Sequence, residues 1–98
     1  MRYIGELTDW IEEEIEGAEN YAEKYLEFKV NGNPFAGKFK QMAGDELQHA
    51  MVIHELAIGE IEKMKAVYTP PAEMQEKWDK CHQKMVKKTE WVKSMLAK

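Results

Sequence analysis

The sequence has one cysteine, three prolines and no apolar run long enough to span a membrane. A single thiol cannot form an internal disulfide, which fits a reducing compartment. A membrane-spanning helix needs about 20 consecutive apolar residues. The amino terminus also turns acidic where a signal peptide would be apolar. We therefore expect an intracellular, cytoplasmic protein with no membrane partner.

A basic surface of the kind that binds nucleic acid is also lacking. The formal net charge is −4, whereas a nucleic-acid-binding domain carries a basic patch with aromatic platforms. Residues 1–30 hold nine acidic side chains against three basic ones, and residues 72–98 hold seven lysines against four acidic side chains. We therefore expect no nucleic-acid partner. Segments of opposite charge predict instead that the first and last helices lie near each other, within one chain or between chains.

Helical periodicity fills three stretches of the chain, and neither strand-like alternation nor an internal repeat interrupts them. In the loop VNGNP, Asn33 is expected to cap the following helix with Pro34 at its first position. In the loop YTPPAE, Thr69 is expected to do the same. The pattern predicts an all-α chain forming a single domain over residues 1–98. Its elements are a hairpin over about 6–66, made of helices 6–29 and 34–66, and a long C-terminal helix over about 71–96.

The second predicted helix has a glutamate among its apolar side chains. At about 100° per residue, Glu46 falls near the centre of the apolar side and His49 lies on its shoulder, one turn later. An unpaired buried carboxylate is costly or takes up a proton, so Glu46 needs a partner. The apolar side of this helix comprises Phe39, Met42, Ala43, Ala50, Ile53, Ala57, Ile61 and Met64.

The first predicted helix offers a second carboxylate at the same level. Glu14 flanks its apolar side closely, on the edge that carries Tyr21. If the hairpin turns within VNGNP, residues whose numbers sum to about 63 lie level, so Glu14 faces His49 and residue 17 faces Glu46. Two carboxylates and an imidazole that converge in an apolar interior are the ligands expected for a first-row metal such as iron, manganese or zinc.

At these residues the sequence resembles the ferritin-like di-iron carboxylate proteins, over roughly residues 10–60. Such proteins carry a glutamate on one helix and E-x-x-H on the next, and Glu14, Glu46 and His49 match this pattern. They often have a tyrosine seven residues after the first glutamate, and Tyr21 stands there. Because the chain has one helix pair, it is most similar to the half-length, encapsulated-ferritin type, in which two hairpins from separate subunits complete a ferritin-like four-helix bundle by homodimerisation.

The resemblance implies a homodimer, or a multiple of dimers, that shares a di-iron site. Glu46 of each chain would bridge the two irons, Glu14 and His49 would be terminal ligands, and Tyr21 would hydrogen-bond to the ligands. The implied activity is that of a ferroxidase, which oxidises Fe(II) to Fe(III) for iron storage or detoxification with these ligands as its catalytic residues. An encapsulin shell is a further implied partner, with its nanocompartment as an alternative location. The long third helix departs from this type, and the tail EWVKSMLAK is not typical of a shell-targeting peptide.

Two other functions fit the same residues. A rubrerythrin-like peroxide-reducing enzyme or a manganese catalase would use the same site, although a rubrerythrin's four-cysteine iron domain has no counterpart here. A helical protein–protein interaction module would bind no metal, and Glu46 and His49 would then pair with each other or face a polar partner. Of the other candidate residues, His54 is expected to be structural, His82 to be solvated on the polar side of the last helix, and Cys81 to be a buried, unreactive thiol.

Overall fold

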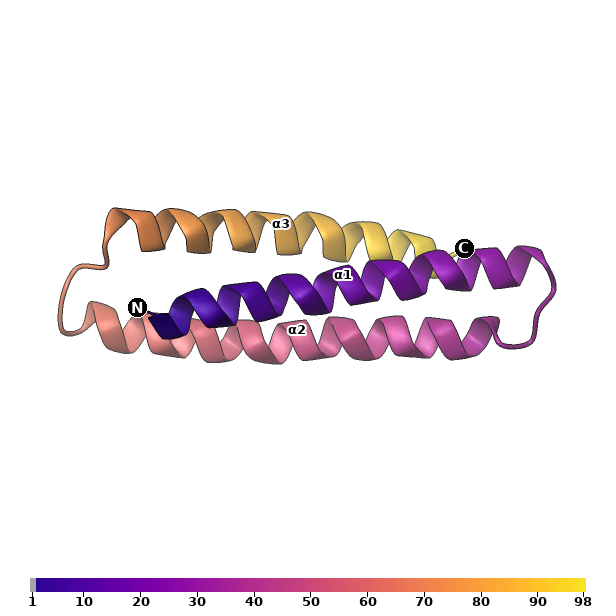
Figure 1. Ribbon diagram of the computed structural model, residues 1–98, viewed down its shortest axis with the longest axis horizontal. Helices are drawn as coiled ribbons and strands as arrows, with labels where there is room; N and C mark the ends of the chain where they lie inside the picture. Colours follow the sequence, from indigo (N-terminus) through magenta and orange to yellow (C-terminus); the bar gives the residue numbers. More distant parts are fainter. Residues whose placement is uncertain (1) are drawn as a thin grey trace.

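The computed structural model describes residues 2–98, with side chains from Ile4 onward. Over these residues the chain forms three helices and no strand: α1 spans Arg2–Val30, α2 spans Ala36–Lys65 and α3 spans Ala72–Leu96. The helices run along the length of a rod of 55 × 18 × 17 Å (Figure 1). None of these described helices has the combined length and apolar character that crossing a bilayer requires. The all-α prediction is confirmed.

The predicted helix boundaries agree with the structure to within two residues, except at the start of α1. This helix begins four residues before the predicted position, at Arg2. The reason is that the apolar stripe extends toward the amino terminus, where Ile4 is 2% exposed and Leu7 is 1% exposed. Burial of each of these side chains stabilises the fold by roughly 1.5–3 kcal/mol, which favours helix up to the end of the stripe.

The turn between α1 and α2 closes through glycine and asparagine. Gly32 has a φ of 69°, in the left-handed region that glycine adopts without strain. The N–H of Asn33 donates to the carbonyl of Phe28 at 2.9 Å, as in a Schellman turn. The side chain of Asn33 then accepts a hydrogen bond from the Phe35 N–H at 2.9 Å. Asn33 therefore binds a backbone N–H ahead of α2. The predicted cap position is wrong, however, because the helix begins at Ala36, its N-cap is Phe35 and Pro34 lies outside it.

The cap predicted at Thr69 is wrong. The residue before α3 is Pro71, with φ −57° and ψ 144°, and no side chain caps the start of the helix. With Thr69 as cap, Pro71 would occupy the second helical position. It has no N–H to donate there, and its extended ψ keeps it outside the helix.

α1 lies between α2 and α3 and packs against both. α2 runs antiparallel to α1, whereas α3 runs parallel to α1 and hardly meets α2 (Figure 1). The buried side chains of α1 are Ile4, Leu7, Thr8, Ile11, Ile15, Ala18, Ala22 and Tyr25. Those of α2 are Ala43, Leu47, Ala50, Ala57 and Ile61, and those of α3 are Met74, Cys81, Val92 and Met95.

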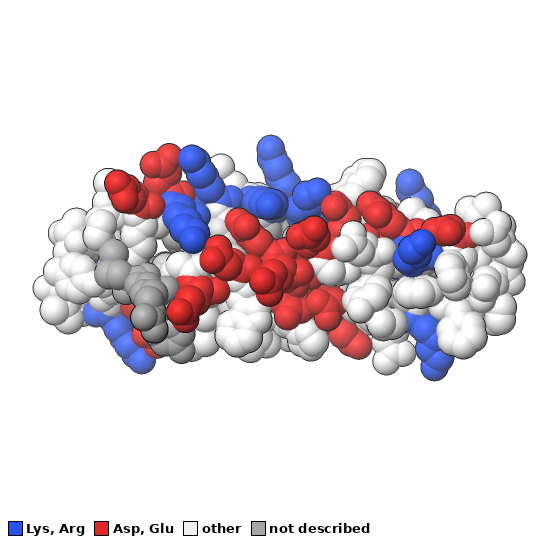
Figure 2. All heavy atoms as spheres, viewed as in Figure 1, with Lys and Arg blue, Asp and Glu red and all other residues white. Residues whose placement is uncertain are grey.

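Opposite charges join α1 and α3, as the charge distribution predicted. Lys77 Nζ lies 3.3 Å from Asp9 Oδ1, and Lys88 Nζ lies 2.8 Å from Glu19 Oε2. Figure 2 shows acidic side chains gathered over the middle of α1, with basic side chains along the edge where α3 lies. The adjacency of the first and last helices therefore occurs within one chain.

The core-facing side of α2 is rotated from the predicted one. Leu47 is buried although it was not in the predicted set, whereas Met42 is 39% exposed. Leu47 belongs to the apolar cluster that contains Ile11 and Ile15 of α1 together with Cys81 of α3. Glu46 consequently lies at the edge of the core, with 25% of its side chain exposed, and not at its centre as predicted.

Candidate metal centre

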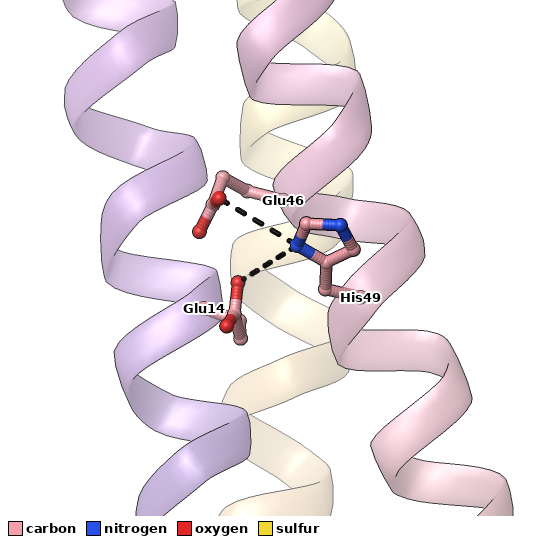
Figure 3. Close-up of side chains that lie close together, drawn as sticks. All are labelled: Glu14, Glu46 and His49. Carbon is pink, nitrogen blue, oxygen red and sulfur yellow. Dashed lines mark hydrogen bonds and ion pairs between the residues drawn. The ribbon is translucent and has the colours of Figure 1, made fainter.

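Glu14, Glu46 and His49 lie together on one face of the hairpin, and we call them the carboxylate–histidine cluster. Glu14 comes from α1, and the other two come from successive turns of α2 (Figure 3). One potential ligand atom from each lies within 4.8 Å of those of the other two. The three side chains therefore lie together, as expected from a hairpin that turns within VNGNP and places Glu14 level with His49.

Buried neighbours fix the backbone of both helices at the cluster. The residue that directly follows each cluster member in the sequence is buried, and these residues are Ile15, Leu47 and Ala50. Successive helical residues point about 100° apart. The cluster members therefore stand at the border between the core and solvent, on helices whose positions the core determines.

The imidazole faces both carboxylates through one nitrogen. His49 Nδ1 lies 3.3 Å from Glu14 Oε2 and 3.6 Å from Glu46 Oε1. The carboxylates are largely covered, with 20% of the Glu14 side chain and 25% of the Glu46 side chain exposed, whereas His49 is 57% exposed. The cluster is thus closed toward the protein and open on the side of His49.

The Glu14 carboxylate affects the ionisation of Glu46. The pKa of Glu46 is raised, first because its protonated form hydrogen-bonds to Glu14, then because burial and the negative charge of Glu14 disfavour a second anion. In the part of the chain that the structure describes, neither carboxylate has a lysine or arginine partner. Oxygen and imidazole donors with excess negative charge fit a first-row divalent cation such as iron, manganese or zinc.

The face that carries the cluster is open. α3 runs behind α1 and α2 in the view of Figure 3, on the side away from the three side chains. Large apolar side chains are nevertheless exposed at positions three, four or seven residues from a cluster member, which places them on the same helix faces. They are Trp10, Met42, Val52 and Leu56, exposed by 39–55%.

Sequence reasoning did not assign a role to Gly17, which adjoins Glu46. A Cβ atom at Gly17 would lie 2.9 Å from Glu46 Oε2, closer than such atoms normally approach. The hairpin register already indicated that residue 17 lies level with Glu46. It could not indicate that the Glu46 carboxylate points toward Gly17, which only the structure shows.

Tyr21, the predicted hydrogen-bond partner of the ligands, is half-buried. Its ring centroid lies 6.3 Å from that of Phe39, at an interplanar angle of 33°. The structure therefore assigns it a packing contact, and its predicted hydrogen bond to the ligands stays a prediction.

The predictions for Cys81 and His82 agree with the structure to different degrees. Cys81 is 2% exposed and its thiol donates to the Thr8 carbonyl at 3.6 Å, which confirms that the thiol is buried. Burial also raises its pKa to about 11, and its low reactivity stays a prediction. The prediction of a solvated His82 is incomplete, because its Nδ1 lies 2.9 Å from His54 Nε2. This contact depends on how α3 meets α2, which the periodicity of one helix cannot indicate. The structural role predicted for His54 agrees with it.

Comparison of the chain with protein-family models, with curated proteins and with solved structures finds no match. The ferritin-like resemblance, the encapsulin partner and the nanocompartment location therefore remain predictions from the sequence. What can be argued about function depends on the geometry of the carboxylate–histidine cluster.

Proposed function

We propose that the chain binds iron as a ferritin-like homodimer and oxidises Fe(II) at a site shared between two subunits. The observation that carries this proposal is the convergence of Glu14, Glu46 and His49 on the open face of the hairpin. Two carboxylates and an imidazole are donors that iron accepts. No lysine or arginine among the described residues neutralises the carboxylates.

A second subunit would complete the donor set. Each chain supplies three donor side chains, which leaves the preferred coordination of iron incomplete. A two-fold axis through the open face would bring an identical set opposite the first. Glu46 would then lie between the two irons, with Glu14 and His49 as the outer ligands. The position of α3 supports this arrangement, since it leaves the cluster face uncovered (Figure 3).

The exposed apolar side chains around the cluster support pairing through this face. Trp10 and Val52 expose 54% and 55% of their surface beside the site. Exposed aromatic and aliphatic side chains that are grouped together mark protein interfaces. Burial of these side chains would also exclude water from the site, which strengthens the attraction between the carboxylates and a cation.

The acidic surface of α1 supports delivery of cations. Acidic side chains gather over the middle of this helix (Figure 2), and the first thirty residues hold nine of them. A surface of one sign raises the local concentration of ions of the opposite sign. Fe(II) would therefore be concentrated beside Glu14.

The ligands favour the oxidised product. Glu14 and Glu46 stabilise Fe(III) more than Fe(II), because the attraction between charges grows with the charge of the ion. This preference promotes the loss of one electron from each Fe(II) to O₂ or peroxide. His49 supplies a neutral donor at the exposed edge of the site, where substrate can enter.

The test is iron content and iron oxidation in the wild type and in the Glu46→Ala variant. The wild type should take up about one iron per chain, as expected when two hairpins hold two metals. It should oxidise Fe(II) when O₂ or peroxide is added. Glu46→Ala should lose both properties, whereas Glu62→Ala, which removes an exposed carboxylate from the same helix, should keep them. Unchanged iron content in Glu46→Ala would contradict the proposal.

The subunit arrangement has a test of its own. Val52→Glu places a charge in the exposed apolar group without altering a ligand. Light scattering should show a dimer for the wild type and a shift toward monomer for Val52→Glu, with iron uptake reduced in parallel. Full iron uptake by a monomer would contradict a shared site.

A metal-free interaction module is the second candidate function. One observation favours it: His49 Nδ1 lies 3.3 Å from Glu14 Oε2, within reach of a direct pairing between the two side chains, and the surrounding apolar side chains could serve association alone. This function predicts a dimer that persists in Glu46→Ala and a wild type that takes up no iron. The same two measurements therefore decide between the candidates.

A further inference from the structure

Gly17 of α1 lies directly against the Glu46 carboxylate. A Cβ atom at this position would lie 2.9 Å from Glu46 Oε2, 3.5 Å from its Cδ and 3.7 Å from its Cγ. The carboxylate therefore occupies the space that any other residue at position 17 would fill.

The backbone does not explain the choice of glycine. Among the described glycines, only Gly32 has a positive φ, so Gly17 adopts a helical conformation open to every residue. Glycine is also among the least favourable residues inside a helix. Gly37, Gly44 and Gly59, which also lie in helices, have no atom within 4 Å of the equivalent Cβ position. Gly17 is distinguished from them by the contact with Glu46.

The two oxygens of Glu46 have different neighbours. Oε1 lies 3.6 Å from His49 Nδ1, whereas Oε2 lies over the backbone of Gly17. A methyl group at position 17 would displace Oε2, and the rigid carboxylate would carry Oε1 away from the imidazole as it turned. The convergence of the cluster thus depends on the gap at Gly17.

We propose that Gly17 is a positioning residue of the metal site: its missing side chain lets the Glu46 carboxylate reach across to α1 and meet Glu14 and His49. This inference rests on the proposed function, since it concerns metal binding by the same cluster. Gly17 acts by having no side chain, which leaves room for the Glu46 carboxylate. The clashing atoms are the end of a flexible glutamate, so the fold can accommodate alanine while the site cannot.

Stability and metal affinity should consequently move in opposite directions in Gly17→Ala. Alanine is the better helix former, so the midpoint of thermal unfolding of the metal-free protein should rise by about 2–6 °C. The affinity for Co(II), a probe whose visible absorption reports its ligands, should fall by at least about tenfold in calorimetric titration. A merely structural glycine would change the first quantity and leave the second unaltered.

Gly59→Ala is the matched control. It makes the same substitution inside α2, thirteen residues beyond Glu46, where a Cβ meets no atom within 4 Å. It should raise the unfolding midpoint and bind Co(II) as the wild type does. In a Glu46→Gln background, Gly17→Ala should cause little further loss of affinity, because the group it displaces no longer carries the charge that binds the metal.

The outcomes separate this inference from the function on which it rests. If the wild type binds Co(II) and Gly17→Ala binds it equally well, the positioning role is overturned and the metal site stands. If the wild type binds no Co(II), the proposed function fails and the inference fails with it. Weaker binding in Gly17→Ala together with a lowered unfolding midpoint would also overturn it, since the loss would then follow from damage to the fold.

Discussion

His54 Nε2 and His82 Nδ1 lie 2.9 Å apart and form the polar link between α2 and α3. Their ring centroids are 5.0 Å apart at an interplanar angle of 27°, so the two ring planes are close to parallel. The Trp78 ring stacks on His54 with a centroid separation of 5.1 Å. A hydrogen bond between two imidazoles needs one acceptor nitrogen, and at least one ring must therefore be neutral.

This pair should make stability depend on pH. Burial, together with neighbouring His82, lowers the pKa of His54 below its ordinary 6.5. As the pH falls, the unfolded chain therefore takes up a proton on His54 before the folded chain does. The contribution of the pair is present above pH 6.5 and is lost as the pH falls toward the folded pKa.

The magnitude should be about 1 kcal/mol of unfolding free energy, the typical contribution of one hydrogen bond. Urea unfolding at neutral and mildly acidic pH measures it. The loss on acidification should be smaller in His82→Gln than in the wild type. Equal pH dependence in the two proteins would show that the pair does not contribute.

Glu46→Gln should stabilise the metal-free protein. The pKa of Glu46 is raised above its ordinary 4.5, so the folded state disfavours its charged form. The resulting stability is present at low pH and is lost as the pH rises through the folded pKa. At neutral pH the neutral amide should therefore raise the free energy of unfolding by about 0.5 kcal/mol, as expected for relief of a like-charge pair.

The same Glu46→Gln variant should lose metal affinity, because the amide has no negative charge to offer. Urea unfolding and calorimetric titration with Co(II) give the two quantities on one sample. A variant that is less stable than the metal-free wild type would show that Glu46 supports the fold and not the site.

Cys81 should resist modification in the folded protein. Burial raises its pKa to about 11, so at pH 8 its thiolate fraction is about a hundredfold smaller than that of a thiol with pKa 9. Reaction with a thiol reagent should be slow in buffer and fast in denaturant, with one group modified per chain. Rapid reaction of the native protein would contradict the burial of this side chain.

Exchange of Glu19 and Lys88 tests the contact between α1 and α3. Lys88→Glu places two carboxylates where the structure has an ion pair of 2.8 Å, and should cost about 0.5–1 kcal/mol, since the pair is partly exposed. Adding Glu19→Lys to it restores opposite charges and should recover most of the loss in a denaturant melt. No recovery in the double variant would indicate that the two side chains do not meet.

The helices and the ligand cluster could be predicted from the sequence because they follow from local rules. The rise and rotation per residue, applied to a hairpin turning within VNGNP, brought Glu14 level with His49 and residue 17 level with Glu46. The apolar side expected for the first helix is present in α1, where Ile11 and Ile15 are 0% and 2% exposed.

What escaped prediction depends on contacts between distant segments. The pairing of His82 with His54 follows from the side of the hairpin that α3 occupies, and the periodicity of a single helix carries no information about that side. The role of Gly17 depends on a glutamate rotamer. Charge distribution was the one long-range signal that succeeded, because opposite net charges favour adjacent helices whatever their detailed packing.

The central position of α1 has a mechanical consequence. Because α2 and α3 both rest on α1 and scarcely on each other, the helix that carries Glu14 is braced from two sides, and its bending is damped along the stretch that holds the donor. The weakest seam of the molecule lies between α2 and α3. Separation of α3 from α2 would leave α1 and α2, the two helices that carry the ligands, packed against each other.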